Sequence, residues 1–300
     1  MKIDQTENWI ELVDCPDIAQ EAFTIVRNEE AVAFIGSGIS AKCYPSWGEI
    51  IKKLCENCGV SYSENINSEN FIEKAEECKQ KHEDKYHETL ADLLGKQTTI
   101  FRFTCDLLLR LPFKSYITVN LDPMLAIRAQ YLNKKSEIFV YPFLKNEGIR
   151  NGNIFYIHGS LGEFSHNPKK IVFSKSEFEE AYVDKGILES FLIQLFAFNN
   201  VIFFGCRLSE PPLYKLLEVI KKNIEQISHA FPGTSLPKRF IFLAKDEGDK
   251  ELDSYYKRIG INLIRYNKIN EDHKGLDKIL ENWCDLKPIR PEIGFTSFGG

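Results

Sequence analysis

The chain has 300 residues, 43% of them hydrophobic and 27% charged, which is enough to bury the core of one large domain or two small ones. Its formal net charge of −5 argues against a broad nucleic-acid-binding face, which requires an excess of Lys and Arg. No apolar run reaches the roughly 20 residues that span a bilayer, and the acidic N-terminal residues do not form a secretory signal. We expect a cytoplasmic protein that binds neither nucleic acid nor membrane directly.

The eight cysteines are scattered, and several lie in apolar surroundings, which is typical of buried thiols in a reducing compartment. Cys55 and Cys58 form one C-x-x-C pair in a segment that reads as a helix ending at Gly59. A structural zinc site would need a second pair at a suitable spacing, and the sequence has none. We therefore expect two neighbouring thiols on one helical face and no bound metal.

The first part of the chain predicts a helix over residues 7–29 and a short apolar strand over residues 31–35. Residues 47–111 then read as a run of helices, with a strongly polar stretch typical of solvated helices. This block predicts a helical insert, at about residues 47–111, on a sheet domain.

The first strand ends in a glycine turn, as does a first βα turn that holds a pyrophosphate. Gly36 permits the tight turn, Gly38 allows an anion to approach the backbone, and Ala41 is small enough for close packing of helix and strand. Free N–H groups at the helix start would supply positive charge. Similar turns also occur in α/β proteins that bind no dinucleotide, so the pattern alone leaves both readings open.

The second part of the chain alternates strands with helices. Strands are predicted at residues 115–119, 138–141, 154–157, 201–204, 240–243 and 262–265, and helices at 122–132, 176–197, 211–228, 249–259 and 272–285. This alternation predicts an α/β fold: a Rossmann-like parallel sheet with helices on both faces and a helical insert subdomain. We expect residues 1–286 to form this domain and residues 287–300 to form a tail that leaves it.

Polar segments follow four of the predicted strands. They begin at Gly36, Thr118, His158 and Gly205. Because ligands of open parallel sheets bind beyond the carboxyl ends of the strands, all four segments should face one crevice. Polar residues that stop apolar strands at that edge are typical of a functional site.

The four segments resemble the motifs of the sirtuin-like family, in particular its prokaryotic branch found in antiviral defence proteins. The motifs are GSGIS at 36–40, PSW at 45–47, TVNLD at 118–122, HGS at 158–160 and GCRLSEPP at 205–212, in the order and rough spacing of the family. The resemblance covers residues 30–215. It implies a Rossmann-like NAD-binding domain with a helical subdomain and attack on the bond between nicotinamide and ribose.

The resemblance implies roles for individual residues. Asn120 would orient water and a ribose hydroxyl, Asp122 would anchor or stabilise charge as an ionised carboxylate, and His158 would accept a proton. The residues implied to bind NAD⁺ are Gly36, Ser37, Gly38, Ser40, Thr118, Gly159, Gly205, Arg207 and Ser209.

Three departures from the family pattern bear on function. Ser37 stands where alanine is usual, Arg207 where serine is usual and Glu210 where aspartate is usual. The changes at Arg207 and Glu210 put the cofactor contacts of the motif at 205–212 in doubt, although Arg207 could meet a phosphate instead. The four-cysteine zinc module of deacetylating sirtuins is absent between residues 159 and 205. Its absence favours NAD⁺ hydrolysis over protein deacetylation.

Structural roles are open for several of the same residues. His158 could be a strand-end histidine bonded to the backbone, and Asp122 could cap the helix that begins near Pro123. Arg102 and Arg110 read as surface charges.

The resemblance implies an NAD⁺ glycohydrolase that yields ADP-ribose and nicotinamide and depletes NAD⁺ during phage infection, an abortive-infection effector. The alternatives are a non-catalytic module that senses NAD or ADP-ribose and an NAD-dependent protein deacylase. No sensor domain is evident after residue 215, so we expect gating by homo-oligomerisation or by a separate protein. Relatives pair with a HerA-type ATPase or a short Argonaute, or assemble into filaments. This chain most resembles the stand-alone subunit that pairs with the ATPase. The apolar stretch at residues 191–198 could supply a subunit contact.

Overall fold

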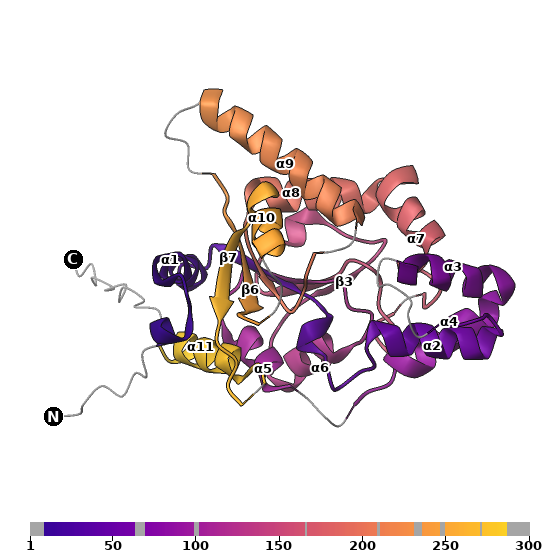
Figure 1. Ribbon diagram of the computed structural model, residues 1–300. Coiled ribbons are helices and arrows are strands. Elements are labelled where there is room, and N and C mark those ends of the chain that lie inside the picture. The colour runs from indigo at the N-terminus through magenta and orange to yellow at the C-terminus, as the bar shows by residue number, and fades with distance from the viewer. Residues whose placement is uncertain are drawn as a thin grey trace, which may run out of the picture.

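The computed structural model describes residues 9–63, 70–98, 102–165, 167–208, 211–230, 236–246, 250–270 and 272–286. These residues contain one seven-stranded sheet, with every neighbouring pair parallel and the order β3-β4-β2-β1-β5-β6-β7 (Figure 1). The strands are β1 Ala31–Ile35, β2 Ser115–Thr118, β3 Ile138–Val140, β4 Asn153–Tyr156, β5 Asn200–Phe204, β6 Arg239–Ala244 and β7 Asn262–Tyr266. Each predicted strand is present within one or two residues of its expected bounds, which confirms the predicted α/β fold.

The helices of the described residues surround this sheet. They are α1 Pro16–Arg27, α2 Trp47–Cys58, α3 Phe71–Lys81, α4 Glu83–Leu94, α5 Phe103–Arg110, α6 Met124–Tyr131, α7 Lys175–Glu179, α8 Ile187–Phe198, α9 Pro211–Ala230, α10 Lys250–Arg258 and α11 Lys274–Asp285. The helix expected over residues 7–29 is shorter, because Pro16 begins α1 and a separate 3-10 helix, Trp9–Leu12, precedes it.

The helix expected over residues 176–197 is divided in three. Between α7 and α8 the chain forms a π-helix, Glu180–Asp184, labelled η5. Gly186 then adopts a left-handed conformation with φ of 58°, which a residue with a side chain rarely adopts. The sequence pattern could not predict this break, because the periodic spacing of apolar residues continues from α7 into α8.

Helices cover both faces of the sheet. In β1, Ala31, Ala33 and Ile35 face the core formed with α1, α5, α6 and α11, whereas Val32 and Phe34 face the core formed with α7, α8, α9 and α10. Figure 1 shows α8, α9 and α10 on one side of the strands and α5, α6 and α11 on the other. Burial on both faces explains why these strands are continuous apolar runs.

The predicted insert at residues 47–111 contains helices with different packing partners. Helices α2, α3 and α4 share a third core and lie together at one end of the sheet (Figure 1). Helix α5 instead buries Cys105 and Leu108 in the sheet core beside α6 and α11. The separate helical subdomain of the described residues therefore consists of α2–α4, because the apolar face of α5 packs on the sheet.

The C-x-x-C pair meets a third thiol inside this subdomain. Cys55 and Cys58 of α2 and Cys78 of α3 are buried, and the Sγ atoms of Cys55 and Cys78 lie 3.8 Å apart. Cys58 Sγ faces the carbonyl of His82 at 4.0 Å. Burial raises the pKa of all three thiols, so they remain protonated. In the part of the chain that the structure describes, no group of His, Cys, Asp or Glu side chains is arranged to hold a metal ion.

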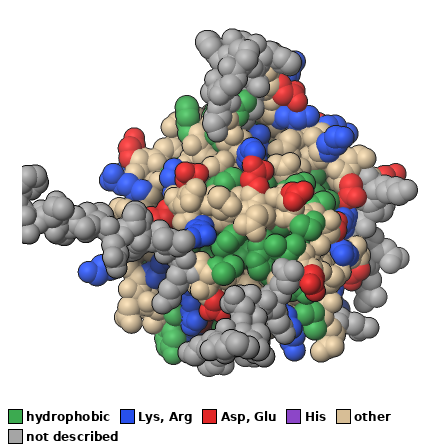
Figure 2. All heavy atoms as spheres, turned by 90° about the vertical axis from the view of Figure 1, so that its left-hand side faces the viewer, with side chains coloured by type: hydrophobic (Ala, Val, Ile, Leu, Met, Phe, Trp, Pro, Cys, Tyr) green, Lys and Arg blue, Asp and Glu red, His purple; other side chains and the backbone are tan. Residues whose placement is uncertain are grey.

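Figure 2 views the molecule from the side of α1 and α11, and hydrophobic side chains gather near the middle of this face among charged ones. The 3-10 helix Trp9–Leu12, α1 and α11 carry half-buried apolar residues that pack on the sheet core: Ile10, Leu12, Ile18, Ile25 and Cys284. None of the helices within the described ranges is both long enough and apolar enough to cross a membrane.

Candidate functional site

The four polar segments meet at one edge of the sheet. They follow β1, β2, β4 and β5, which are adjacent in the order β4-β2-β1-β5. The chain leaves β1 toward β2 on one side, and it leaves β5 toward β6 on the other, so the strand order reverses between β1 and β5. Ligands of open α/β sheets bind at such a point, beyond the carboxyl ends of the strands.

The glycine turn after β1 forms a 3-10 helix, Ser37–Ile39, labelled η2. The N–H of Gly36 donates to the carbonyl of Phe204 at 2.9 Å, and the N–H of Gly38 donates to the carbonyl of Gly205 at 2.8 Å. The N–H groups of Ile39 and Ser40 are bonded within the turn. The expectation of free N–H groups for an anion is therefore wrong for these amides, because the loops after β1 and β5 bond to each other.

Both glycines are required by the close approach of these loops. A Cβ on Gly36 would lie 2.5 Å from Cys206 Cβ, and a Cβ on Gly38 would lie 2.8 Å from Gly205 Cα. Gly205 itself has φ of +65°, and a Cβ there would lie 2.7 Å from Ile39 N. Packing between loops thus explains the glycines without a ligand. Ser37 and Gly38 remain exposed on their outer side.

The start of the first helix also differs from the expected pattern. Helix α2 begins at Trp47, and Ala41 lies before it in a bridge with Tyr44, so Ala41 does not pack a helix against the strand. Ser46 caps α2 in a capping box, in which Glu49 Oε2 accepts the N–H of Ser46 at 2.7 Å. The helix N-terminus is capped by its own residues.

Asn120 is fixed by the glycine turn. Its Nδ2 donates to the carbonyl of Gly36 at 3.3 Å and to Ser40 Oγ at 3.2 Å, and its N–H donates to Thr118 Oγ1 at 3.0 Å. Thr118 in turn donates to the carbonyl of Ile35 at 2.9 Å. These contacts orient the amide, and its Oδ1 is buried without a hydrogen-bond partner among the described residues. A buried amide oxygen left in this way fits a donor from a bound ligand or water.

Asp122 lies buried beneath this amide. Its Oδ1 accepts the N–H of Met124, the first residue of α6, at 3.2 Å, although Pro123 rather than Asp122 is the N-cap residue of that helix. Burial raises the pKa of Asp122 to about 6, although hydrogen bonds from Ser40 and Met124 oppose the shift. The carboxylate is thus mostly ionised at neutral pH and connects to Asn120 through Ser40.

His158 is buried, with 4% of its surface exposed. Its Nε2 lies 2.9 Å from the phenol oxygen of Tyr182, and its ring meets the ring of Phe178 edge-on at 5.2 Å. Burial lowers the pKa of His158 to about 3, so the imidazole is neutral. The imidazole does not face solvent, because the segment that follows folds over it, with Val172 N donating to the His158 carbonyl at 2.8 Å.

Asn120 and His158 reach the same edge of the sheet but not each other. No hydrogen bond joins the two side chains in the described structure; Asn120 contacts the turn after β1, and the His158 ring packs on Phe178 of α7 and Tyr182 of η5. A ligand that touches both would have to lie across the ends of β2 and β4, which are neighbours in the sheet.

The remaining predicted residues have varied environments. Gly159 has φ of +87°, and a Cβ there would lie 2.5 Å from the carbonyl of Lys170. Arg207 is exposed, and its carbonyl accepts a hydrogen bond from Tyr256 at 2.9 Å. Ser209 and Glu210 lie outside the described residues. The backbone conformation and the close carbonyl therefore explain why residue 159 is glycine. The guanidinium of Arg207 lies at the surface.

Sequence reasoning missed two residues at this edge. Tyr182 lies inside a predicted helix, and nothing in the local pattern separates it from a core aromatic. Arg102 was expected to be a surface charge, but its Nη1 lies 3.5 Å from the carbonyl of Gly38 and only 14% of its side chain is exposed. Arg102 is close to the glycine turn in space but far from it in sequence, so the spacing of residues could not predict this contact.

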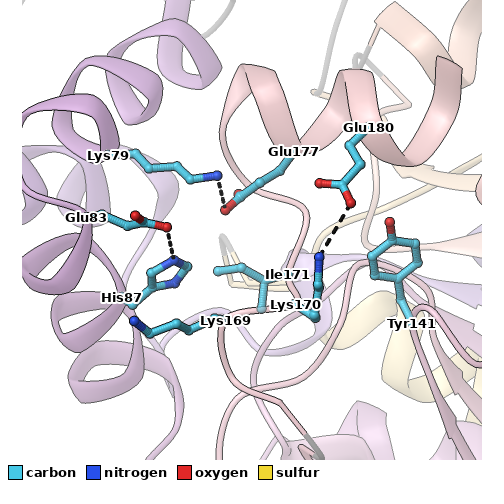
Figure 3. Close-up of a pocket in the computed structure, with 9 residues that line it drawn as sticks. All are labelled: Lys79, Glu83, His87, Tyr141, Lys169, Lys170, Ile171, Glu177 and Glu180. Atoms are coloured by element: carbon cyan, nitrogen blue, oxygen red, sulfur yellow. Dashed lines mark hydrogen bonds and ion pairs between the residues drawn. The ribbon is translucent and has the colours of Figure 1, made fainter. Parts of the chain in front are cut away.

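A cavity of about 240 Å³ lies between the helical subdomain and α7 (Figure 3). Its lining is strongly charged and consists of Lys79, Glu83, His87, Tyr141, Lys169, Lys170, Ile171, Glu177 and Glu180. None of the residues predicted from the motifs lines it. The three lysines of this lining are already paired: Lys79 with Glu177 at 3.0 Å, Lys169 with Asp84 at 3.0 Å, and Lys170 with Glu180 at 3.4 Å. We assign the candidate site to the strand ends, where the unpaired Asn120 oxygen lies.

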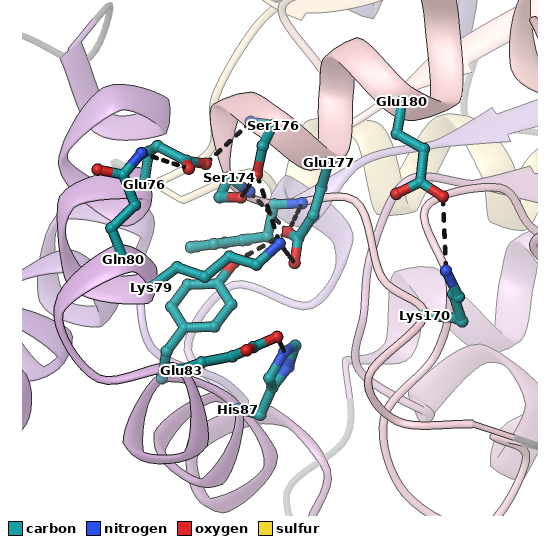
Figure 4. Close-up of polar contacts among 12 residues, drawn as sticks. Glu76, Lys79, Gln80, Glu83, His87, Lys170, Ser174, Ser176, Glu177 and Glu180 are labelled. Atoms are coloured by element: carbon teal, nitrogen blue, oxygen red, sulfur yellow. Dashed lines mark hydrogen bonds and ion pairs between the residues drawn. The ribbon is translucent and has the colours of Figure 1, made fainter. Parts of the chain in front are cut away.

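One buried carboxylate beside this cavity joins the helical subdomain to α7 (Figure 4). Glu177 Oε2 accepts the hydroxyl of Tyr86 at 3.0 Å and the N–H groups of Phe173 at 3.0 Å and Ser174 at 2.8 Å. Its Oε1 lies 3.0 Å from Lys79 Nζ. Charge-assisted bonds of this kind are stronger than neutral ones, so Glu177 holds α3 and α4 against α7.

The comparison with protein-family models identifies a SIR2-like domain over residues 114–264, which is half of the chain. This segment contains Asn120, Asp122, His158 and Gly205, whereas the glycine turn after β1 lies outside it. No curated protein matches the chain.

Proposed function

Because the chain belongs to the SIR2-like family, whose domain implies use of NAD⁺, we propose that it hydrolyses NAD⁺ to ADP-ribose and nicotinamide. Water adds to the anomeric carbon of the ribose, the bond to the nicotinamide nitrogen breaks, and one proton is released. The leaving group is already cationic in the substrate, so it departs neutral without a strong acid. The protein must orient water, stabilise an oxocarbenium-like ribose and accept a proton.

The unpaired Oδ1 of Asn120 is the observation that carries the proposal. Its amide is held by Gly36 and Ser40 before any ligand binds, so accepting a hydrogen bond from water or a ribose hydroxyl costs little reorganisation. Ser40 links this amide to Asp122, whose pKa of about 6 suits a proton acceptor at neutral pH. With a pKa of about 3, His158 is a poor base in the ligand-free protein. Its Nε2 faces Tyr182, so Nδ1 is the atom left for the substrate.

A non-catalytic module that binds NAD or ADP-ribose is the second candidate. The burial of His158 favours it, because a neutral histidine with a depressed pKa contributes little as a base. The two candidates share the binding edge and differ in turnover.

Nicotinamide release from NAD⁺ separates these functions. We expect release without any acyl-lysine peptide, and we expect Asn120→Ala to lower turnover by about 10²–10⁴-fold while the protein stays folded. Asn57→Ala is the matched control, since its amide bonds to Thr89 in the helical subdomain, away from the strand ends. Binding of NAD⁺ without release would support the sensor module, and release only with the peptide would support a deacylase.

We also propose a biological role, which rests on the family resemblance: an NAD⁺-depleting effector of anti-phage defence in the cytoplasm. Its activity would be gated by homo-oligomerisation or by a HerA-type ATPase or short Argonaute partner. In α8, the side chains of Ile193 and Phe198 are exposed and could join a subunit contact, although most of its apolar residues are buried. Light scattering of the wild type and of Phe198→Ser tests this: a monomer that is fully active alone would contradict self-assembly as the gate.

A further inference from the structure

Most backbone N–H groups of the glycine turn are not available to a diphosphate. The N–H groups of Gly36, Gly38, Ile39 and Ser40 are bonded within the protein, and α2 is capped by its own residues. A dinucleotide nevertheless carries two negative phosphates across the point where the strand order reverses. With four of the turn's amides already bonded, side chains are expected to supply much of the compensating charge.

Two cations lie beside the exposed side of this turn. Arg102 Nη1 is 3.5 Å from the carbonyl of Gly38, and Arg102 Nη2 is 3.9 Å from Asp272 Oδ1. Lys42 Nζ is 3.4 Å from the same Asp272 oxygen. One carboxylate thus serves two cations, and all three separations are long for hydrogen bonds between charged groups. Among the described residues, Asp272 is the one carboxylate paired with these two cations.

The backbone at Lys42 gives an independent reason to expect a use for its side chain. Lys42 has φ of +69°, a conformation that glycine adopts without strain and that other residues adopt at a cost. Its side chain is 73% exposed, so packing does not explain why lysine occupies this position. Strained residues of this kind cluster at binding sites and switch regions.

We propose that Arg102 and Lys42 bind the diphosphate of the dinucleotide on the exposed side of Ser37 and Gly38. The planar guanidinium can engage two phosphate oxygens, and the ammonium adds a point charge. In the ligand-free protein Asp272 holds both cations in place, and the diphosphate competes with it. This inference rests on the proposed use of NAD⁺.

Calorimetric binding of ADP-ribose, ADP and adenosine to the full chain tests the proposal. Arg102→Met should lower the affinity for ADP-ribose and for ADP by roughly ten- to hundredfold and leave the affinity for adenosine unchanged, because only the phosphates meet the guanidinium. Arg102→Lys should recover part of the loss. Lys42→Gly should lower the affinity for ADP-ribose by roughly two- to tenfold. The melting temperature of this variant should equal or exceed that of the wild type, since the backbone strain is relieved. Asp272→Asn should tighten ADP-ribose binding.

Arg110→Met is the matched control, because Arg110 lies at the other end of the same helix, α5. Unchanged ADP-ribose affinity in Arg102→Met and Lys42→Gly would overturn the inference, as would equal losses for adenosine. If the wild type releases nicotinamide while Arg102→Met binds ADP-ribose normally, only this inference fails. If Arg102 governs ADP-ribose binding but no nicotinamide is released, only the hydrolase proposal fails. A wild type that binds neither NAD⁺ nor ADP-ribose contradicts both.

Discussion

The Nε2 atom of His158 lies 2.9 Å from the phenol oxygen of Tyr182, inside a core that also contains Phe178. Tyr182 belongs to the π-helix between α7 and α8, and π-helical turns are frequent at functional sites. Glu177, in the preceding turn, is held by Tyr86 of the helical subdomain. One short segment therefore connects that subdomain to His158.

The hydroxyl of Tyr182 should matter to turnover more than to folding. Tyr182→Phe keeps the ring, which stacks on Phe178 at 5.8 Å, but removes the partner of His158. We expect kcat for nicotinamide release to fall about tenfold with little change in KM, the size expected for one buried hydrogen bond. Tyr214→Phe is the control, because its hydroxyl bonds to Glu218 on α9. Equal kcat for Tyr182→Phe and wild type would remove Tyr182 from the site.

His158 should make the fold sensitive to acid. Its pKa is about 3 in the folded protein and 6.5 ordinarily, so the unfolded chain binds the additional proton. Its contribution to stability is complete above pH 6.5 and is lost as pH falls toward 3, by about 1.4 kcal/mol per pH unit. Urea unfolding of wild type and His158→Gln at several pH values measures the difference. A difference in unfolding free energy that does not change with pH would contradict the buried neutral imidazole.

Asp122 should act in the opposite direction. Burial raises its pKa from 3.8 to about 6, so the folded protein retains the proton that the unfolded chain releases. Its contribution to stability is present below pH 3.8 and is lost as pH rises to 6, about 3 kcal/mol in all. Asp122→Asn keeps the acceptor for Met124 and removes the titration. The stability of the variant should therefore increase relative to that of the wild type as pH rises from 3.8 to 6. If the variant instead became more stable relative to the wild type as pH falls, the Asp122 carboxylate would not be desolvated.

Substituting alanine for glycine should change stability in opposite directions at two positions. A Cβ on Gly38 would meet the backbone of Gly205 at 2.8 Å, so Gly38→Ala should destabilise by roughly 1–3 kcal/mol. Gly48 lies inside α2, where the nearest atom to a new Cβ is Phe71 Cζ at 3.8 Å. Gly48→Ala should therefore stabilise by roughly 0.5–1 kcal/mol. Thermal unfolding of both variants checks the prediction, and a neutral Gly38→Ala would mean that the two loops separate readily.

The sheet and the edge that holds the candidate site followed from sequence, because they depend on local patterns. Strands such as residues 201–204 are short, apolar runs bounded by helices, and parallel strands bring their carboxyl ends to one edge regardless of their order. The contact of Asp122 with the start of α6 was likewise local, as the bond from Met124 shows.

The contacts between distant segments were not predictable. The pairing of His158 with Tyr182, the approach of Arg102 to Gly38 and the meeting of Cys78 with Cys55 depend on how helices are placed over the sheet. The amides of the glycine turn also bond to a loop that lies far along the chain, near Gly205. No periodicity or spacing within the sequence records such contacts.

The position of β1 limits how this protein can be divided. The segment that matches the SIR2-like model begins at residue 114, yet β1 is the strand between β2 and β5 and is almost fully buried. A chain starting at residue 114 would leave β2 and β5 separated by the width of a missing strand, each with an unpaired inner edge. Such edges are templates for aggregation. Residues 31–35 are therefore part of the folding unit, and the matched segment is not a module that could be transferred alone.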